Sequence, residues 1–179
     1  MNFLIKGFLP ALAFCLITAS VVADIRVGVE LPLSYSFKEA DDGSSLDADG
    51  MPSGFILLAQ LPFISGGAGL ESYEIKLDQT GNHNISLLMA DVFYILPVPV
   101  VDISLGFGYG TVEVKGDNAS YYQKTNCSQY FLRIGVPIGP LFELIGSYHN
   151  VFARVAKKNS DTLLEAGGTL TTVGVAIGF

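Results

Sequence analysis

Residues 169–179, at the end of the chain, alternate between two kinds of side chain with a period of two. Val173, Val175, Ile177 and Phe179 fall on one side, and small residues lie between them on the other. Only an extended strand gives this period, because successive side chains of a strand point to opposite faces. One face of the strand is therefore apolar, and the other is nearly bare.

An apolar strand face can be buried in two ways. In a soluble sandwich it packs against a second sheet. In a small transmembrane barrel it meets lipid, while the face with small residues points into a crowded interior. The pattern of the remaining residues distinguishes a soluble sandwich from a transmembrane barrel.

The other end of the sequence has the pattern of a cleavable export signal over residues 1–23. Lys6 precedes an apolar run, and small residues before Asp24 provide a cleavage site. The run is shorter than the roughly 20 residues that a spanning helix needs. The sequence thus predicts an exported chain with a single domain over residues 24–179.

Composition narrows the class of protein further. The formal net charge is −7, which argues against a nucleic-acid partner. Half of the residues are hydrophobic, so without spanning helices they must fill a core or lie on alternate positions of strands. Removal of Cys15 with the signal would leave Cys127, which we predict to be an unpaired surface thiol in a loop.

After the signal, eight stretches alternate in character, and polar or proline- and glycine-containing segments separate them. They cover residues 25–37, 55–63, 70–77, 85–96, 101–110, 129–138, 142–149 and 169–179. We expect the apolar side of each to face outward and the first to alternate without a break. In the third, this places Tyr73, Ile75 and Leu77 on one side and turns Glu74 and Lys76 inward.

The connections between these stretches alternate between long and short, as in outer-membrane barrels. Loops are predicted over residues 39–53, 78–84, 115–128 and 156–166. Turns are predicted at residues 66–69, 97–100 and 139–140. Aromatic residues would mark the two membrane boundaries: Phe63, Tyr94, Phe142 and Phe179 at the turn end, and Tyr35, Phe37, Tyr109, Tyr130 and Tyr148 at the loop end.

The turn at residues 97–100 also predicts a register for its hairpin. Two prolines there cannot donate to a ladder, so Leu96 would pair with Val101. Asp91 would then lie opposite Gly106. A glycine opposite a large side chain leaves room for it inside a narrow barrel.

In its length, strand number, connections and final strand, the chain resembles the small eight-stranded outer-membrane proteins of the OmpA, OmpX and OmpW kind, although it has no tryptophan. The resemblance implies an all-β fold, a closed antiparallel up-and-down transmembrane β-barrel, in the bacterial cell outer membrane. It also implies contact with outer-membrane lipid and lipopolysaccharide. Val173, Val175, Ile177 and Phe179 would then be an assembly signal for the barrel assembly machinery.

The interior of such a barrel would hold ionisable side chains of both signs: Arg26, Glu30, Glu74, Lys76, Asp91, Asp102, Arg133, Glu143 and His149. We interpret them as a network of ion pairs that fills the interior, because buried charges are seldom retained unpaired. The same residues could instead line a gated pore. No cofactor or metal site is predicted, since the acidic segment around Asp47 and Asp49 lacks the spaced ligands of a calcium loop.

The sequence leaves four functional classes to compare. Ser147, His149 and Glu143 share a strand face and resemble the serine, histidine and acid groups of outer-membrane lipid A deacylases, but their order is reversed. We therefore predict a non-enzymatic barrel whose loops contact extracellular ligands or host surfaces. A narrow channel for small or hydrophobic solutes is the alternative. A secreted lipocalin-like carrier would instead turn the apolar faces inward and leave Arg133 and Asp91 on the surface.

Overall fold

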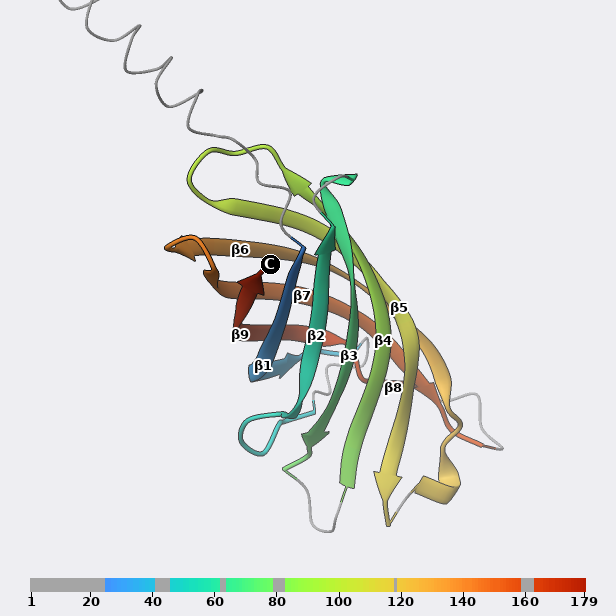
Figure 1. Ribbon diagram of the computed structural model, residues 1–179. Helices are drawn as coiled ribbons and strands as arrows, with labels where there is room; N and C mark the ends of the chain where they lie inside the picture. Colours follow the sequence, from blue (N-terminus) through green and yellow to red (C-terminus); the bar gives the residue numbers. More distant parts are fainter. Residues whose placement is uncertain (1–24, 41–45, 62–63, 79–82, 118, 159–162) are drawn as a thin grey trace, which may run out of the picture.

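The computed structural model describes residues 25–40, 46–61, 64–78, 83–117, 119–158 and 163–179. The chain forms a barrel of antiparallel strands with its longer connections at one end, the loop end, and short turns at the other (Figure 1). The strands are β1 (Arg26–Phe37), β2 (Ser53–Leu61), β3 (Gly66–Lys76), β4 (His83–Leu96), β5 (Asp102–Gly116), β6 (Thr125–Ile138), β7 (Phe142–Ala156), β8 (Leu163–Glu165) and β9 (Gly168–Gly178). A 3-10 helix, η2 (Ala119–Tyr121), follows β5.

The predicted export signal, residues 1–23, and the predicted girdle residue Phe63 lie outside the described residues. Among the residues that are described, no helix is long and apolar enough to cross a membrane.

The barrel closes because β1 pairs with β2 on one side and with β9 on the other. Strands β2 to β7 pair antiparallel in chain order, and β7 pairs with β9. These pairings confirm the predicted closed antiparallel barrel of eight strands. The additional strand β8 pairs with the end of β7, within residues 156–166 that were predicted as a loop.

In the half of the barrel near the turns, apolar side chains face outward and charged ones inward. Val175, Leu105 and Ile134 are about half exposed on the exterior, whereas Arg133 and Asp91 are almost completely buried inside. This is the orientation predicted for a membrane-spanning barrel. A soluble carrier would require the reverse in this half.

Near the loop end the polarity of the two faces inverts. Tyr73 and Ile75 lie inside with 1% exposure, while Glu74 and Lys76 lie outside. The prediction that these two charged residues face the interior is therefore wrong. The strand keeps its period of two, but here its exterior lies beyond the apolar band, so polar residues can face water. We call this part of the barrel the outer extension: residues 35–37, 73–76, 83–87, 111–116, 125–127 and 153–156.

The glycines at residues 66–69, predicted as a turn, belong to β3, where Gly66 pairs with Leu61. A Cβ atom on Gly67 would overlap the ring of Phe93. The glycine is therefore needed for close approach inside the barrel rather than for a turn. The chain reverses before Gly66 instead.

β1 does not alternate without a break. Its register against β9 shifts between Pro32 and Ser34, as in a β-bulge. Tyr35 therefore points inside and donates a hydrogen bond from its hydroxyl to the carbonyl of Ala166 at 2.8 Å. Phe37 packs partly buried against the same interior. Neither is the exterior girdle residue that was predicted, whereas Tyr109, Tyr130 and Tyr148 do lie on the exterior.

Two other predictions are corrected at β5 and β6. Leu96 pairs with Ile103, so Asp91 lies opposite Gly108, two residues from the predicted register. The shift follows from a wider turn, in which Val100 has φ 80°. Because the shift is an even number, inward residues stay inward. In β6 the strand begins before Cys127, which is buried in the interior and is not a surface thiol.

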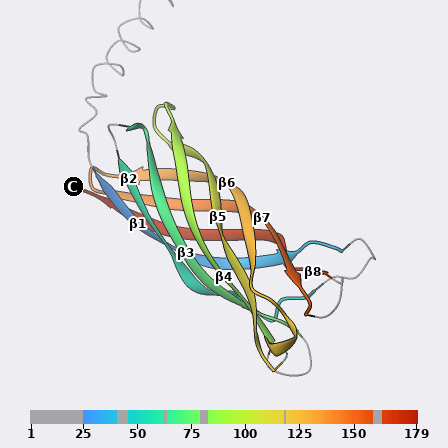
Figure 2. The same cartoon turned by 90° about the vertical axis from the view of Figure 1, so that its right-hand side faces the viewer.

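The ladder between β1 and β2 is short. It runs from Arg26 opposite Gln60 to Glu30 opposite Ile56, and then it stops. Pro32 follows, and it has no N–H to donate. Figure 2 shows the outer part of β1 continuing beside β9 while β2 and β3 curve away. We call this separation the β1–β2 seam.

Candidate functional site

The barrel interior is built in levels, and the lowest is a cluster of three charged residues near the turn end. Arg26 Nη1 donates to Asp102 Oδ2 at 2.7 Å and to Glu143 Oε2 at 2.8 Å. The residues begin or nearly begin β1, β5 and β7, so the cluster ties three strands together. Arg26 and Asp102 are partly exposed, and Glu143 is buried.

A second, fully buried ion pair lies deeper. Arg133 Nε donates to Glu30 Oε1 at 2.7 Å. The guanidinium carbon lies 4.5 Å from the ring centre of Phe93 and 5.0 Å from that of Phe131. These ring faces attract the cation and replace part of the water that it loses on burial.

Glu30 joins this pair to two further strands. Its second oxygen accepts a hydrogen bond from Ser147 Oγ at 2.6 Å and another from the hydroxyl of Thr172. The carboxylate from β1 thus contacts side chains of β6, β7 and β9. Such a shared acceptor stabilises a buried charge better than one partner would.

Farther along β6 and β7 toward the loop end lies a group centred on Gln129. Its amide nitrogen donates to Asp91 Oδ1 at 2.9 Å, and its oxygen is 3.2 Å from His149 Nδ1. His149 Nδ1 is also 3.3 Å from Glu71 Oε1, and its ring stacks on Phe131 with centres 4.9 Å apart. We call these residues together the central polar layer: Glu30, Glu71, Asp91, Gln129, Arg133, Ser147, His149 and Thr172.

The structure brings together part of the predicted interior set. It places these residues inside: Arg26, Glu30, Asp91, Asp102, Arg133, Glu143 and His149. Glu74 and Lys76 are outside, as described above. Sequence reasoning left Glu71, Gln129, Ser147 and Thr172 out of the network. Glu71 lies within the predicted third stretch, but on the same face as Tyr73, and that face was predicted to point away from the interior.

The central polar layer leaves no room for water to pass. Glu30, Glu71 and His149 have 0% exposure, and Gln129 and Arg133 have 1%. A passage as wide as one water molecule would expose the side chains that line it. Across the described residues the barrel is therefore filled at this level.

The candidate catalytic trio is engaged in other contacts. The hydroxyl of Ser147 donates to Glu30, while His149 contacts Gln129 and Glu71. Glu143 belongs to the cluster around Arg26. A nucleophile and its base need a mutual hydrogen bond and access to substrate, and these side chains are arranged for structural pairing instead.

Above the central polar layer the interior becomes apolar. The outer cluster contains Tyr35, Ile56, Tyr73, Ile75, Leu77, Ile85, Leu87, Met89, Val112, Val114, Cys127, Val151, Ala153, Val155, Ala166 and Leu170. Leu46, Ala48 and Tyr122 pack against it from the connecting loops. In the described part of the chain, no group of three His, Cys, Asp or Glu side chains is arranged to hold a metal ion.

Comparison with known proteins gives the fold. Neisserial surface protein A matches with a TM-score of 0.56 and 13% identity, over 87% of this chain and 96% of that protein. The outer membrane protein OprG from Pseudomonas aeruginosa matches with 0.55 and 12%, over 88% and 96%. The outer membrane protein AlkL matches with 0.53 and 11%, over 88% and 90%. No protein-family model matches the sequence, and neither does any curated protein.

At these identities the likeness concerns the fold alone, and it confirms the resemblance to small outer-membrane barrels. The chain itself adds the second observation, an exterior band of half-exposed apolar side chains around strands β1 to β9. Such a band requires contact with hydrocarbon. Fold and exterior together make the chain an integral β-barrel of a bacterial outer membrane.

Proposed function

We propose that this outer-membrane barrel is a non-enzymatic protein whose outer extension presents a rigid surface to extracellular ligands or host surfaces. The observation that carries the proposal is the filled interior. Ion pairs and apolar side chains occupy the barrel from Arg26 at the turn end to the cluster around Ile75 at the loop end. A barrel filled in this way has no path for ions, but it holds its outer surface in a fixed shape.

The loops are also tied to one another at their bases. The backbone of Asp49 donates to the carbonyl of Lys76, and that of Asp78 donates to the carbonyl of Asp47, both at 2.9 Å. On the other side, Lys158 donates to the carbonyl of Tyr121 at 2.7 Å. Surfaces fixed before binding lose less conformational entropy when a ligand arrives, which supports a binding role.

Two further kinds of partner are expected for a barrel in the outer membrane: lipids and the machinery that inserts it. Outer-membrane lipid and lipopolysaccharide would surround the exterior band. The barrel assembly machinery would recognise Val173, Val175 and Ile177 of β9 together with Phe179, which directly follows this strand; all four are exposed.

The test combines a conductance measurement with a surface assay. Purified barrel in planar bilayers should show no ion conductance, while cells displaying it should adhere to immobilised host glycans or matrix proteins. Replacing residues 119–124 and 157–158 with glycine and serine should abolish adhesion without changing conductance. Steady channel currents from the unaltered chain would overturn the proposal, as would adhesion that is unaffected by the replacement.

A second candidate, passage of hydrophobic solutes, is favoured by a specific pair of observations. The interior of the outer extension is apolar, and the β1–β2 seam interrupts the wall beside it. Vesicles containing the barrel should then take up an apolar fluorescent probe faster than empty vesicles, with no ion current. Equal uptake rates in the two kinds of vesicle would rule this function out.

A further inference from the structure

Positive charge gathers on one side of the outer end of this acidic chain. Lys38, Lys124, Arg154, Lys157 and Lys158 are exposed there, at the ends of β1, β6 and β7. Contacts hold these segments together: the backbone of Lys38 donates to the carbonyl of Gly167, and Thr125 Oγ1 donates to the carbonyl of Arg154 at 2.6 Å.

Beneath the cations lies an aromatic pair on the same exterior face. The ring centres of Tyr130 and Phe152 are 5.7 Å apart, and about half of each side chain is exposed. Tyr130 stands at the upper edge of the apolar band, because Ser128 and Asn126 follow it outward along β6. From the membrane toward water, this face thus changes from apolar to aromatic and then to cationic.

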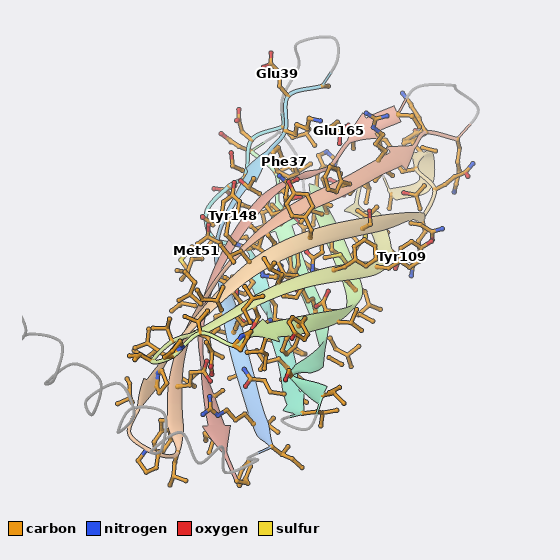
Figure 3. All side chains as sticks on the ribbon, turned by 90° about the horizontal axis from the view of Figure 1, so that it is seen from above. Phe37, Glu39, Met51, Tyr109, Tyr148 and Glu165 are labelled. Carbon is orange, nitrogen blue, oxygen red and sulfur yellow. The ribbon has the colours of Figure 1, made fainter. Side chains whose placement is uncertain are left out.

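A surface hollow of about 310 Å³ lies between the two zones. Lys38, Asn126 and Arg154 line its polar side, and Phe152 lines its apolar side. Glu165 also lines it and accepts a hydrogen bond from Arg154 Nε at 2.9 Å. Figure 3 shows Glu165 beside Phe37 at this end of the barrel, with Glu39 farther out along the chain.

Glu165 does not cancel the positive charge of this face. Its side chain is 14% exposed, whereas that of Arg154 is 56% exposed. In this ion pair Glu165 is the more buried partner, and the guanidinium of Arg154 stays at the surface. The four lysines supply the excess positive charge around it.

The opposite side of the outer extension is different. There Lys115 forms an ion pair with Glu74 and lies 3.8 Å from Glu113, so its charge is balanced. Among the described residues, the β6–β7 side combines five exposed cations with an aromatic, lipid-level surface in one place. A molecule complementary to this face carries both negative charge and apolar chains.

We infer that this face is a binding site for a phosphorylated glycolipid of the outer leaflet. Lys38 and Arg154 contact its phosphate groups, and Tyr130 and Phe152 lie along an acyl chain. The inference rests on the outer-membrane placement in the proposed function and names one lipid partner for it. Each lysine or arginine near a membrane surface attracts anionic headgroups, so a phosphorylated lipid should bind to this side of the barrel in preference to the others.

The test uses two double variants with the same change of charge. K38Q/K124Q removes two cations from the proposed site, and K76Q/K115Q removes two from the opposite side. Binding of bisphosphorylated lipid A to the refolded barrel in detergent is measured by native mass spectrometry. The unaltered chain and K76Q/K115Q should bind equally well, and K38Q/K124Q should bind about thirtyfold more weakly. Dephosphorylated lipid A should bind all three weakly.

Several results would overturn the inference. Equal losses in both double variants would mean that only total charge matters, and unchanged binding in K38Q/K124Q would mean that the site lies elsewhere. If inorganic phosphate competed as well as lipid A, the ligand would be a free anion rather than a lipid. A conducting barrel that still showed the selective loss would refute the proposed function and leave this site standing.

Discussion

The two halves of this barrel use the same strands with opposite polarity. In the membrane half, Leu105 and Val175 face outward, and Arg133 is buried with Glu30. In the outer extension, Ile75 and Val112 are buried, and Glu74 faces outward. The strand period is unbroken between them at β3, β4 and β5.

The comparison shows that the solvent, not the strand, decides which face is apolar. Hydrocarbon outside allows polar groups to be used inside, where they must be paired. Water outside restores the arrangement of an ordinary soluble barrel, with an apolar core. Each half should therefore respond to its own kind of substitution, and four experiments test this, from the largest expected effect to the smallest.

Breaking the buried ion pair should be the most damaging change. Arg133→Met leaves the carboxylate of Glu30 buried without its charged partner, which should lower the free energy of unfolding by about 3–5 kcal/mol. Urea unfolding in lipid vesicles measures the loss. R133M combined with Glu30→Gln should recover much of it, and a double variant no better than R133M would show that the pair is not the cause.

Truncating the core of the outer extension should be nearly as harmful. Ile75→Ala should lower the free energy of unfolding by about 2–5 kcal/mol, because it opens a cavity among fully buried side chains. The matched control is Leu88→Ala on the lipid face of β4, which is 55% exposed and should change stability far less. Similar losses in the two variants would mean that the halves do not differ.

Adding a charge to the exterior should destabilise the membrane half and leave the outer extension almost unchanged, whereas truncating the core should mainly affect the outer extension. Leu105→Arg puts a cation into the apolar band and should cost about 2–4 kcal/mol. Ser86→Arg in the outer extension lies between Glu74 and Glu113 in the ladders and should be within about 0.5 kcal/mol of neutral. Equal costs, measured by the same unfolding experiment, would contradict a water-exposed outer extension.

The smallest effect is expected at the exterior ion pair. Lys115→Gln removes the partner of Glu74 and should change stability by about 1 kcal/mol or less, because both groups are partly exposed. The difference from the unaltered chain should shrink further as salt is added. A loss that is large and independent of salt would show that the pair is shielded from water.

Much of the membrane half follows from the sequence, because the alternation of Leu105, Ile134 and Val175 has one physical meaning there. The outer extension does not follow from the same rule. The expectation of lipid along the whole length of each strand assigned Tyr73 and Glu74 to the wrong faces. Nothing in the alternation shows where the membrane ends.

Two other errors have local causes. The register shift between Pro32 and Ser34 turns Tyr35 inward, although the apolar pattern runs through it unchanged. The glycines at residues 66–69 resemble a turn, but their role is to admit the ring of Phe93. Glu71 was missed for the same reason as Tyr73, because the two share a face that was predicted to point outward.

The inversion of polarity is tested most directly along the exterior and interior of β5. In a Cys127→Ala background, single spin labels at positions 105, 107, 112, 113 and 115 report contact with oxygen dissolved in lipid and with a water-soluble nickel complex. Labels at 105 and 107 should respond to oxygen, those at 113 and 115 to nickel, and the one at 112 to neither. A lipid-type response at 113, or a water-type response at 105, would contradict the account.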